Sequence, residues 1–246
     1  MKRFMSAAAP IVLAVSFALF VWNEAARETL LRALFPGRMS YIYERVPLAQ
    51  LVYQHVALVA ISSGLAAVAG VALGVFVTRP AGRDFQPIVR DISSVAQTFP
   101  PVAVLALAVP AIGFGFAPSI VALFTYSILP VINNTISGLD SVDPSVVDAS
   151  RGVGMTGSQI LFLSELPLAA RVIVAGIRTS VVINVGTATV GAVVGAGGLG
   201  TVIVSGLVRD NAAYVFTGAV TAAFFAFGLD FTLARIERRL YDARTD

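Results

Sequence analysis

The run from Leu51 to Val77 constrains the fold of this chain more than any other feature of its sequence. Its only strongly polar side chains are Gln54 and His55. A helix needs about 20 apolar residues to cross ~30 Å of hydrocarbon, and this run meets that requirement. Its apolar residues follow one another continuously, whereas a membrane barrel strand alternates between apolar and polar positions. The run therefore predicts a membrane-spanning α-helix.

The composition extends this conclusion to the whole chain. Hydrophobic residues make up 57% of it and charged residues only 13%, whereas soluble domains carry roughly 25% charged residues. We therefore expect an all-α integral membrane protein with about six transmembrane helices, the third kinked at Pro100-Pro101 and Pro110. The expected spans are Ser6–Trp22, Gln50–Thr78, Ile92–Ile112, Pro118–Ile136, Thr179–Ala196 and Ala212–Leu233.

The supply of reactive side chains is small. Cysteine is absent, which excludes disulfides and thiolate metal sites. The chain has one histidine, and its only lysine is Lys2. An intramembrane enzyme needs paired carboxylates, a Ser/His arrangement or metal ligands at membrane depth, and no such set is present. We expect no enzyme activity, metal or cofactor on this chain. A passive channel, which conducts without nucleotide, stays open as another class of function.

The basic residues predict the orientation of the spans. With the N-terminus inside, 12 of the 17 lysines and arginines fall in cytoplasmic segments and 5 in outer ones. This asymmetry predicts that both termini of the multi-pass protein lie in the cytoplasm. The net charge of +3 then reflects anchoring at the inner leaflet of the lipid bilayer, and we expect no nucleic-acid partner.

This topology makes the segment from Ser137 to Arg178 the largest cytoplasmic loop. Asp143 and Pro144 are typical of a helix start, as N-cap and first helical residue. The stretch "GVGMTG" predicts a flexible break, and "SQILFLSELP" predicts a second short helix that Pro167 limits. Two short helices joined by a glycine hinge favour a docking site for a cytoplasmic partner.

The same loop carries a motif. The stretch "VDASRGVGMTGSQILFLSELP" resembles the signature loop of ABC importer permeases, E-A-A-x-x-x-G-x9-I-x-L-P. Ala149, Gly154, Leu166 and Pro167 match the pattern, and Asp148 keeps the carboxylate of its glutamate. The two departures are serines: Ser150 replaces an alanine and Ser164 replaces the isoleucine.

The surrounding segments narrow the resemblance. From about His55 to Leu233 the chain resembles the osmoprotectant branch of these permeases, which carries glycine betaine, choline and carnitine; methionine or a sulfonate is the alternative cargo. The resemblance implies a second permease copy or paralogue, two ABC ATPase subunits, and a periplasmic or lipid-anchored substrate-binding protein. No G-x-x-x-x-G-K-[ST] occurs here, so ATP and Mg²⁺ belong to the partner ATPase. We expect three parts: 1–49 with the first helix and an external loop, the ABC importer transmembrane domain 50–236 with its cytoplasmic coupling loop 137–171, and a cytoplasmic tail 237–246. The resemblance gives no role for 1–49, and it implies a multi-pass protein of the bacterial inner membrane.

Three groups of residues follow as candidate sites. The ATPase-coupling loop comprises Asp148, Ala149, Gly154, Leu166 and Pro167. Polar residues inside the spans either line a translocation path or bond a neighbouring helix; they are Gln97, Asn184 and Thr187. The glycines of "GAVVGAGGLG" form an outer gate or a close helix contact, with Gly191 and Gly195 spaced for packing; they are Gly191, Gly195, Gly197, Gly198 and Gly200.

Overall fold

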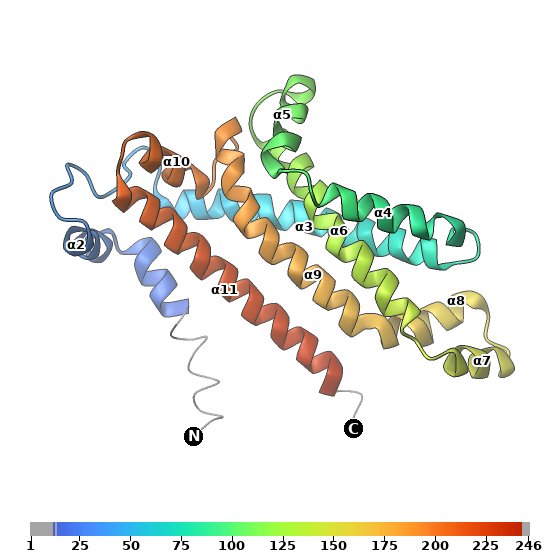
Figure 1. Ribbon diagram of the computed structural model, residues 1–246. Helices are drawn as coiled ribbons and strands as arrows, with labels where there is room; N and C mark the ends of the chain where they lie inside the picture. The colour runs from blue at the N-terminus through green and yellow to red at the C-terminus, as the bar shows by residue number, and fades with distance from the viewer. Residues whose placement is uncertain (1–11, 13, 243–246) are drawn as a thin grey trace. The chain divides into compact units, whose positions relative to one another are not determined.

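The computed structural model describes residue 12 and residues 14–242, and within that part of the chain it contains helices and no strand (Figure 1). The expected all-α fold is confirmed. The helices are α2 (Glu24–Leu34), α3 (Leu48–Thr78), α4 (Gln86–Ala96), α5 (Pro101–Ile112), α6 (Phe116–Asp140), α7 (Pro144–Gly152), α8 (Gly157–Ile160), α9 (Leu166–Ala188), α10 (Gly200–Val208) and α11 (Ala212–Asp242). Short 3₁₀ helices cover Arg83–Phe85 and Thr189–Val194, and a π-helical turn covers Leu161–Glu165.

In the described part of the chain, four helical segments are long and apolar enough to cross a membrane: Leu48–Thr78, Phe116–Asp140, Gly157–Val194 and Ala212–Arg238. The pair α4 and α5 makes a fifth if the two count as one broken span. The expected first span, Ser6–Trp22, lies partly outside the described residues; residues 14–22 are helical. The expected number of six is therefore approximate, and the membrane-spanning character is confirmed.

The third expected span differs from the prediction. It is not one kinked helix, because α4 ends at Ala96 and α5 begins at Pro101. A proline disfavours the helical conformation in the residue before it, so Pro100 and Pro101 together stop α4 and start α5. Pro110, in contrast, lies inside α5, which continues to Ile112.

The chain forms two compact units. Among the described residues, the first contains residue 12 and residues 14–62, 101–123 and 182–232. Its core includes Leu51, Leu199, Val202 and Tyr214. Within this unit the Arg38 guanidinium donates to the Asp210 carbonyl at 2.7 Å, and this hydrogen bond links the segment after α2 to the turn before α11.

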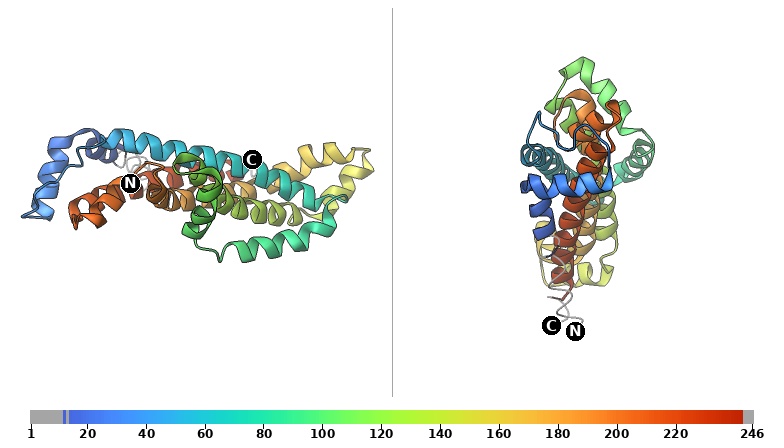
Figure 2. Two further views of the ribbon diagram at one scale, coloured as in Figure 1. Left: turned by 90° about the horizontal axis from the view of Figure 1, so that it is seen from above. Right: turned by 90° about the vertical axis from the view of Figure 1, so that its left-hand side faces the viewer.

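The second unit contains, of the described residues, 63–100, 124–181 and 233–242. Glycines hold its helices at very short separations. A Cβ added to Gly74 of α3 would lie 2.6 Å from the Cβ of Thr135 of α6, and one added to Gly176 of α9 would lie 2.4 Å from the Cβ of Asn134. Small residues of this kind let membrane helices approach at backbone distance. Helices α7 and α8 lie at the end of α6 and the start of α9 (Figures 1 and 2).

Candidate functional site: the loop between α6 and α9

Helix α7 begins where the sequence predicts. The Asp143 carboxylate accepts a hydrogen bond from the Ser145 backbone N–H at 2.8 Å, and Pro144 occupies the first helical position. This N-cap satisfies one of the amide groups that have no partner within the helix. Hydrogen bonds from the backbone and the side chain of Ser145 lower the pKa of Asp143 from its usual value.

Helix α7 ends at Gly152, and Gly154 forms the turn that closes it. The Met155 amide donates to the Ser150 carbonyl at 3.1 Å, and the Gly154 amide donates to the Arg151 carbonyl at 2.9 Å. These two bonds form a Schellman motif, which requires a left-handed residue at the position of Gly154. Its φ is +85°, a conformation that glycine adopts without the steric penalty of a Cβ. Within this chain a Cβ at Gly154 would meet no atom within 4 Å, so the glycine is required by the backbone conformation and not by a close neighbour.

Helix α8 begins with a capping box. The Gln159 amide donates to Thr156 Oγ1 at 3.4 Å, and the Thr156 amide donates to Gln159 Oε1 at 2.8 Å. The T-x-x-Q spacing could have predicted this start.

The expectation that Pro167 limits this second helix is wrong. The helical path continues from Gly157 through Pro167 into α9, with the π-helical turn Leu161–Glu165 between them. In that turn the Leu166 amide donates to the Leu161 carbonyl, five residues back. A π-turn shifts the hydrogen-bond register locally, and such shifts accommodate a residue that lacks an N–H.

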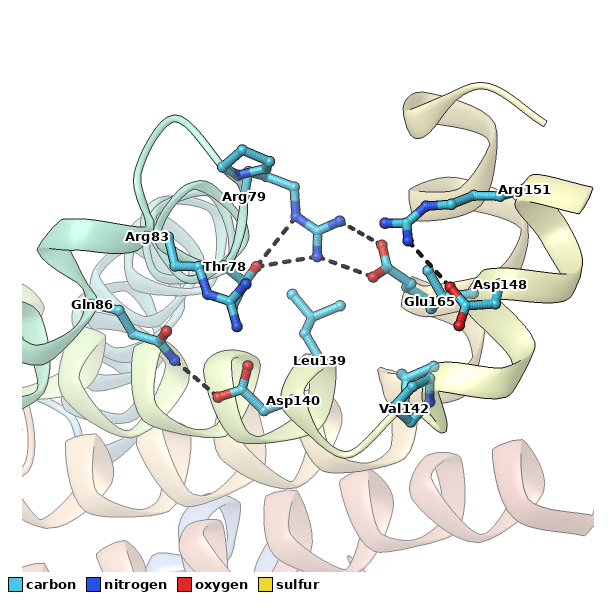
Figure 3. A pocket seen from close by; sticks show the side chains of 13 residues that line it. Thr78, Arg79, Arg83, Gln86, Leu139, Asp140, Val142, Asp148, Arg151 and Glu165 are labelled. Carbon is cyan, nitrogen blue, oxygen red and sulfur yellow. Dashed lines mark hydrogen bonds and ion pairs between the residues drawn. The ribbon is translucent and has the colours of Figure 1, made fainter. Parts of the chain in front are cut away.

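A pocket of about 440 Å³ lies beside α7 (Figure 3). Charged side chains meet across it in pairs. Arg79 Nη1 and Nη2 donate to the two carboxylate oxygens of Glu165, at 2.5 and 3.3 Å. Arg151 Nη1 donates to Asp148 at 3.2 Å. The lining residues are Thr78, Arg79, Pro80, Arg83, Gln86, Leu139, Asp140, Val142, Pro144, Val147, Asp148, Arg151 and Glu165.

The loop residues predicted from the motif come together here in different environments. Asp148, Ala149 and Gly154 are exposed on α7 and the turn after it. Leu166 packs against the buried cluster of Leu139, Ala169 and Ile173, and Pro167 is exposed. Leu166 thus anchors the loop to the helices, and the other four form its surface.

Sequence reasoning missed the partner of that loop, Arg79. Its place directly after the long apolar run was visible, but Glu165 lies 86 positions further along the chain, and this separation hides the pairing. The sequence also gave no reason to separate Val153, Phe162 and Leu163 from the other apolar residues. Their side chains are 79%, 65% and 68% exposed, so the loop presents apolar surface at Val153, beside Gly154, and on the π-helical turn.

The glycine-rich stretch lies in the first unit and is irregular. After α9 the chain forms a 3₁₀ helix, and Gly195, Gly197 and Gly198 then have positive φ before α10 begins at Gly200. The Gly198 amide donates to Gln54 Oε1 of α3 at 2.9 Å. The expected packing pair is only half correct. A Cβ on Gly191 would lie 3.0 Å from Ser119 Oγ, while Gly195 has open space within this chain because it lies beyond the helical part.

The predicted pathway residues occupy three environments. Asn184 is fully buried, and its Nδ2 donates to Ser62 Oγ of α3 at 2.9 Å. Of the two expected roles, it therefore bonds a neighbouring helix. Thr187 is half-buried, and its hydroxyl donates to the Ile183 carbonyl in its own helix. Gln97 is exposed in the break after α4.

The described residues form a helical membrane domain that carries a compact, exposed loop between two of its spans. Residues 70–242 match the family described as the binding-protein-dependent transport system inner membrane component, and the chain belongs to this family. It is therefore a multi-pass inner-membrane component of a binding-protein-dependent transport system.

Individual relatives lie in one branch. The chain is 40% identical over 230 residues to the osmoprotectant import permease protein OsmY of Salmonella typhimurium. The matched region covers 94% of this chain and 92% of that relative. It is 40% identical over 191 residues to the choline transport system permease protein OpuBB of Bacillus subtilis, covering 78% and 87%. Among solved structures, a chain of the MetNI methionine ABC transporter in an inward-facing conformation matches with a TM-score of 0.70 and 25% identity, over 81% of this chain and 99% of that one.

Proposed function

We propose that this chain is the permease subunit of an ATP-driven importer for quaternary ammonium osmoprotectants of the glycine betaine, choline and carnitine type. The observation that carries the proposal is the 40% identity to an osmoprotectant import permease across 94% of the chain. A relative this similar over its whole length favours that cargo class over methionine, since the methionine transporter chain is 25% identical.

The geometry of the loop supports docking on an ABC ATPase. The capped helices α7 and α8 hold the Gly154 turn in a fixed shape, and the exposed Val153 beside it offers an apolar contact. Asp148 and Arg151 pair on the exposed face of α7, at 3.2 Å, where a partner's charged groups can reach them. We assign one ATPase to each of two permease copies or paralogues. ATP and Mg²⁺ bind to those ATPases and not to this chain.

Cargo selection belongs to the separate substrate-binding protein in this proposal. A pathway must pass the cation without holding it strongly, because tight binding slows release. Gln97 and Thr187 are neutral polar residues with exposed surface in this chain, and we retain both for the pathway. We withdraw Asn184 as a direct pathway residue, since its side chain is fully buried against α3. The glycine-rich stretch remains our proposed outer gate.

The test is reconstitution of the complete transporter in proteoliposomes with its ATPase and binding protein. We expect ATP-dependent uptake of labelled glycine betaine, choline or carnitine, and no uptake with a non-hydrolysable nucleotide. Preferential uptake of methionine in the same vesicles would contradict the cargo assignment. Flux without nucleotide would instead identify a passive channel.

A further inference from the structure

The two serines that depart from the signature motif contact each other. Ser150 Oγ of α7 lies 3.2 Å from Ser164 Oγ of the π-helical turn. The Ser150 hydroxyl hydrogen is already donated to the Val146 carbonyl, at 2.8 Å. A hydroxyl has a single hydrogen to donate, so Ser164 donates to Ser150. The paired departures thus form one bond that ties α7 to the π-turn.

The residue after Ser164 continues this connection to α3. Glu165 is buried, and both of its carboxylate oxygens accept hydrogen bonds from Arg79, the residue that directly follows α3. The Arg79 guanidinium also donates to the hydroxyl of Thr78, the last residue of α3, at 3.3 Å. Bidentate arginine–carboxylate pairs fix geometry as well as charge. The end of α3 is therefore held to the π-turn in a defined orientation.

The Arg79–Glu165 pair connects two regions. On one side, α7 and α8 present the surface proposed for docking. On the other side, α3 packs on α6 at backbone distance, since a Cβ at Gly70 or Gly74 would overlap Val131 or Thr135. Energetic coupling between regions is carried by contiguous contacts of this kind.

We propose that Arg79 and Glu165 are positioning residues that make α3 follow the docking loop, with the Ser150–Ser164 bond as the preceding contact. This inference rests on the proposed transport function. It assigns the pair to the coupling of ATP hydrolysis to movement of the spans, and not to ATPase binding or cargo recognition.

The experiment measures ATP hydrolysis and cargo uptake in the same proteoliposomes of the complete transporter. Glu165→Gln should still co-purify with the ATPase, while the ATP hydrolysed per cargo molecule rises about tenfold. The charge swap Arg79→Glu with Glu165→Arg should restore the ratio to within about threefold of wild type. Glu237→Gln is the matched control. It removes a pair of similar exposure, Arg178–Glu237 at 3.1 Å, that joins α9 to α11, and its ratio should stay at the wild-type value.

A second variant separates positioning from stability. Arg79→Met with Glu165→Leu leaves no unpaired buried charge, and such apolar replacements of an ion pair are often neutral or stabilising. It should assemble and still be uncoupled. Wild-type coupling in this variant would overturn the proposal, as would a Glu165→Gln variant that assembles and keeps the wild-type ratio. If wild-type vesicles take up none of the proposed cargoes, the proposed function fails separately. In that case, the measured quantity is the change in ATP hydrolysis rate when the binding protein is added. If this change is the same in Arg79→Met with Glu165→Leu as in wild type, the proposal is overturned; if the change is lost, the proposal is supported.

Discussion

Gly152, the last residue of α7, and Gly154, in the turn after it, should respond to alanine in opposite directions. Gly154 has a φ of +85°, and a Cβ there would meet no atom within 4 Å. Gly154→Ala therefore carries a conformational cost and no steric one, about 1–2 kcal/mol for a left-handed residue with a Cβ. Gly152 is the last residue of α7, has no positive φ and also has open space around it. Gly152→Ala should stabilise the helix by about 0.5–1 kcal/mol.

The two variants should thus differ by about 1.5–3 kcal/mol, or roughly 10- to 100-fold in the opening equilibrium of the turn. Amide hydrogen exchange of the loop reports this equilibrium, because the Met155 amide is protected by its bond to Ser150. Exchange should accelerate in Gly154→Ala and slow in Gly152→Ala, and Gly154→Asn should lie nearer to wild type since asparagine tolerates this conformation. ATPase co-purification should be weakest for Gly154→Ala, stronger for Gly154→Asn and strongest for Gly152→Ala. A change of the same sign in both alanine variants would refute the Schellman assignment.

The remaining predictions concern topology, helix packing and pH. In intact cells, an impermeant thiol reagent should label Met39→Cys and not Val153→Cys, both sites being highly exposed in a chain without native cysteine; the reverse result would invert the proposed orientation. Gly74→Ala should lower the thermal unfolding temperature in detergent, because its Cβ would lie 2.6 Å from a side chain of α6 and overpacking typically costs about 1–3 kcal/mol. Gly64→Ala, with open space at its Cβ, is the control. Hydrogen bonding lowers the pKa of Asp143. The α7 cap should therefore be complete above about pH 4, the usual pKa of an aspartate carboxyl group, and should be lost as the pH falls through the lowered pKa of Asp143. Amide exchange at the start of α7 that does not depend on pH would contradict this.

Features set by local chemistry could be predicted from the sequence. The long apolar runs predicted the spans, Asp143 and Pro144 predicted the start of α7, and Gly154 predicted the turn after it. Each depends on the residue itself and its near neighbours, so a short window of sequence contains the cause.

Features set by distant contacts could not be predicted in this way. Pro167 ends a helix by itself, but the π-turn before it lets the helix continue. The burial of Asn184 depends on Ser62, 122 residues away. The pairing of Arg79 with Glu165 likewise requires the fold that brings the end of α3 to the start of α9.

The break between α4 and α5 has a consequence for the lipid that surrounds the protein. Residues 97–100 are non-helical and exposed in the single chain. The Tyr126 hydroxyl donates to the Phe99 carbonyl, which supplies one partner to the backbone there. Hydrocarbon supplies none, so irregular backbone at membrane depth must face protein or water. If α4 and α5 form one broken span, the side of the chain that carries Gln97 faces protein or water and not acyl chains, and lipid contacts are then expected on the continuous helices.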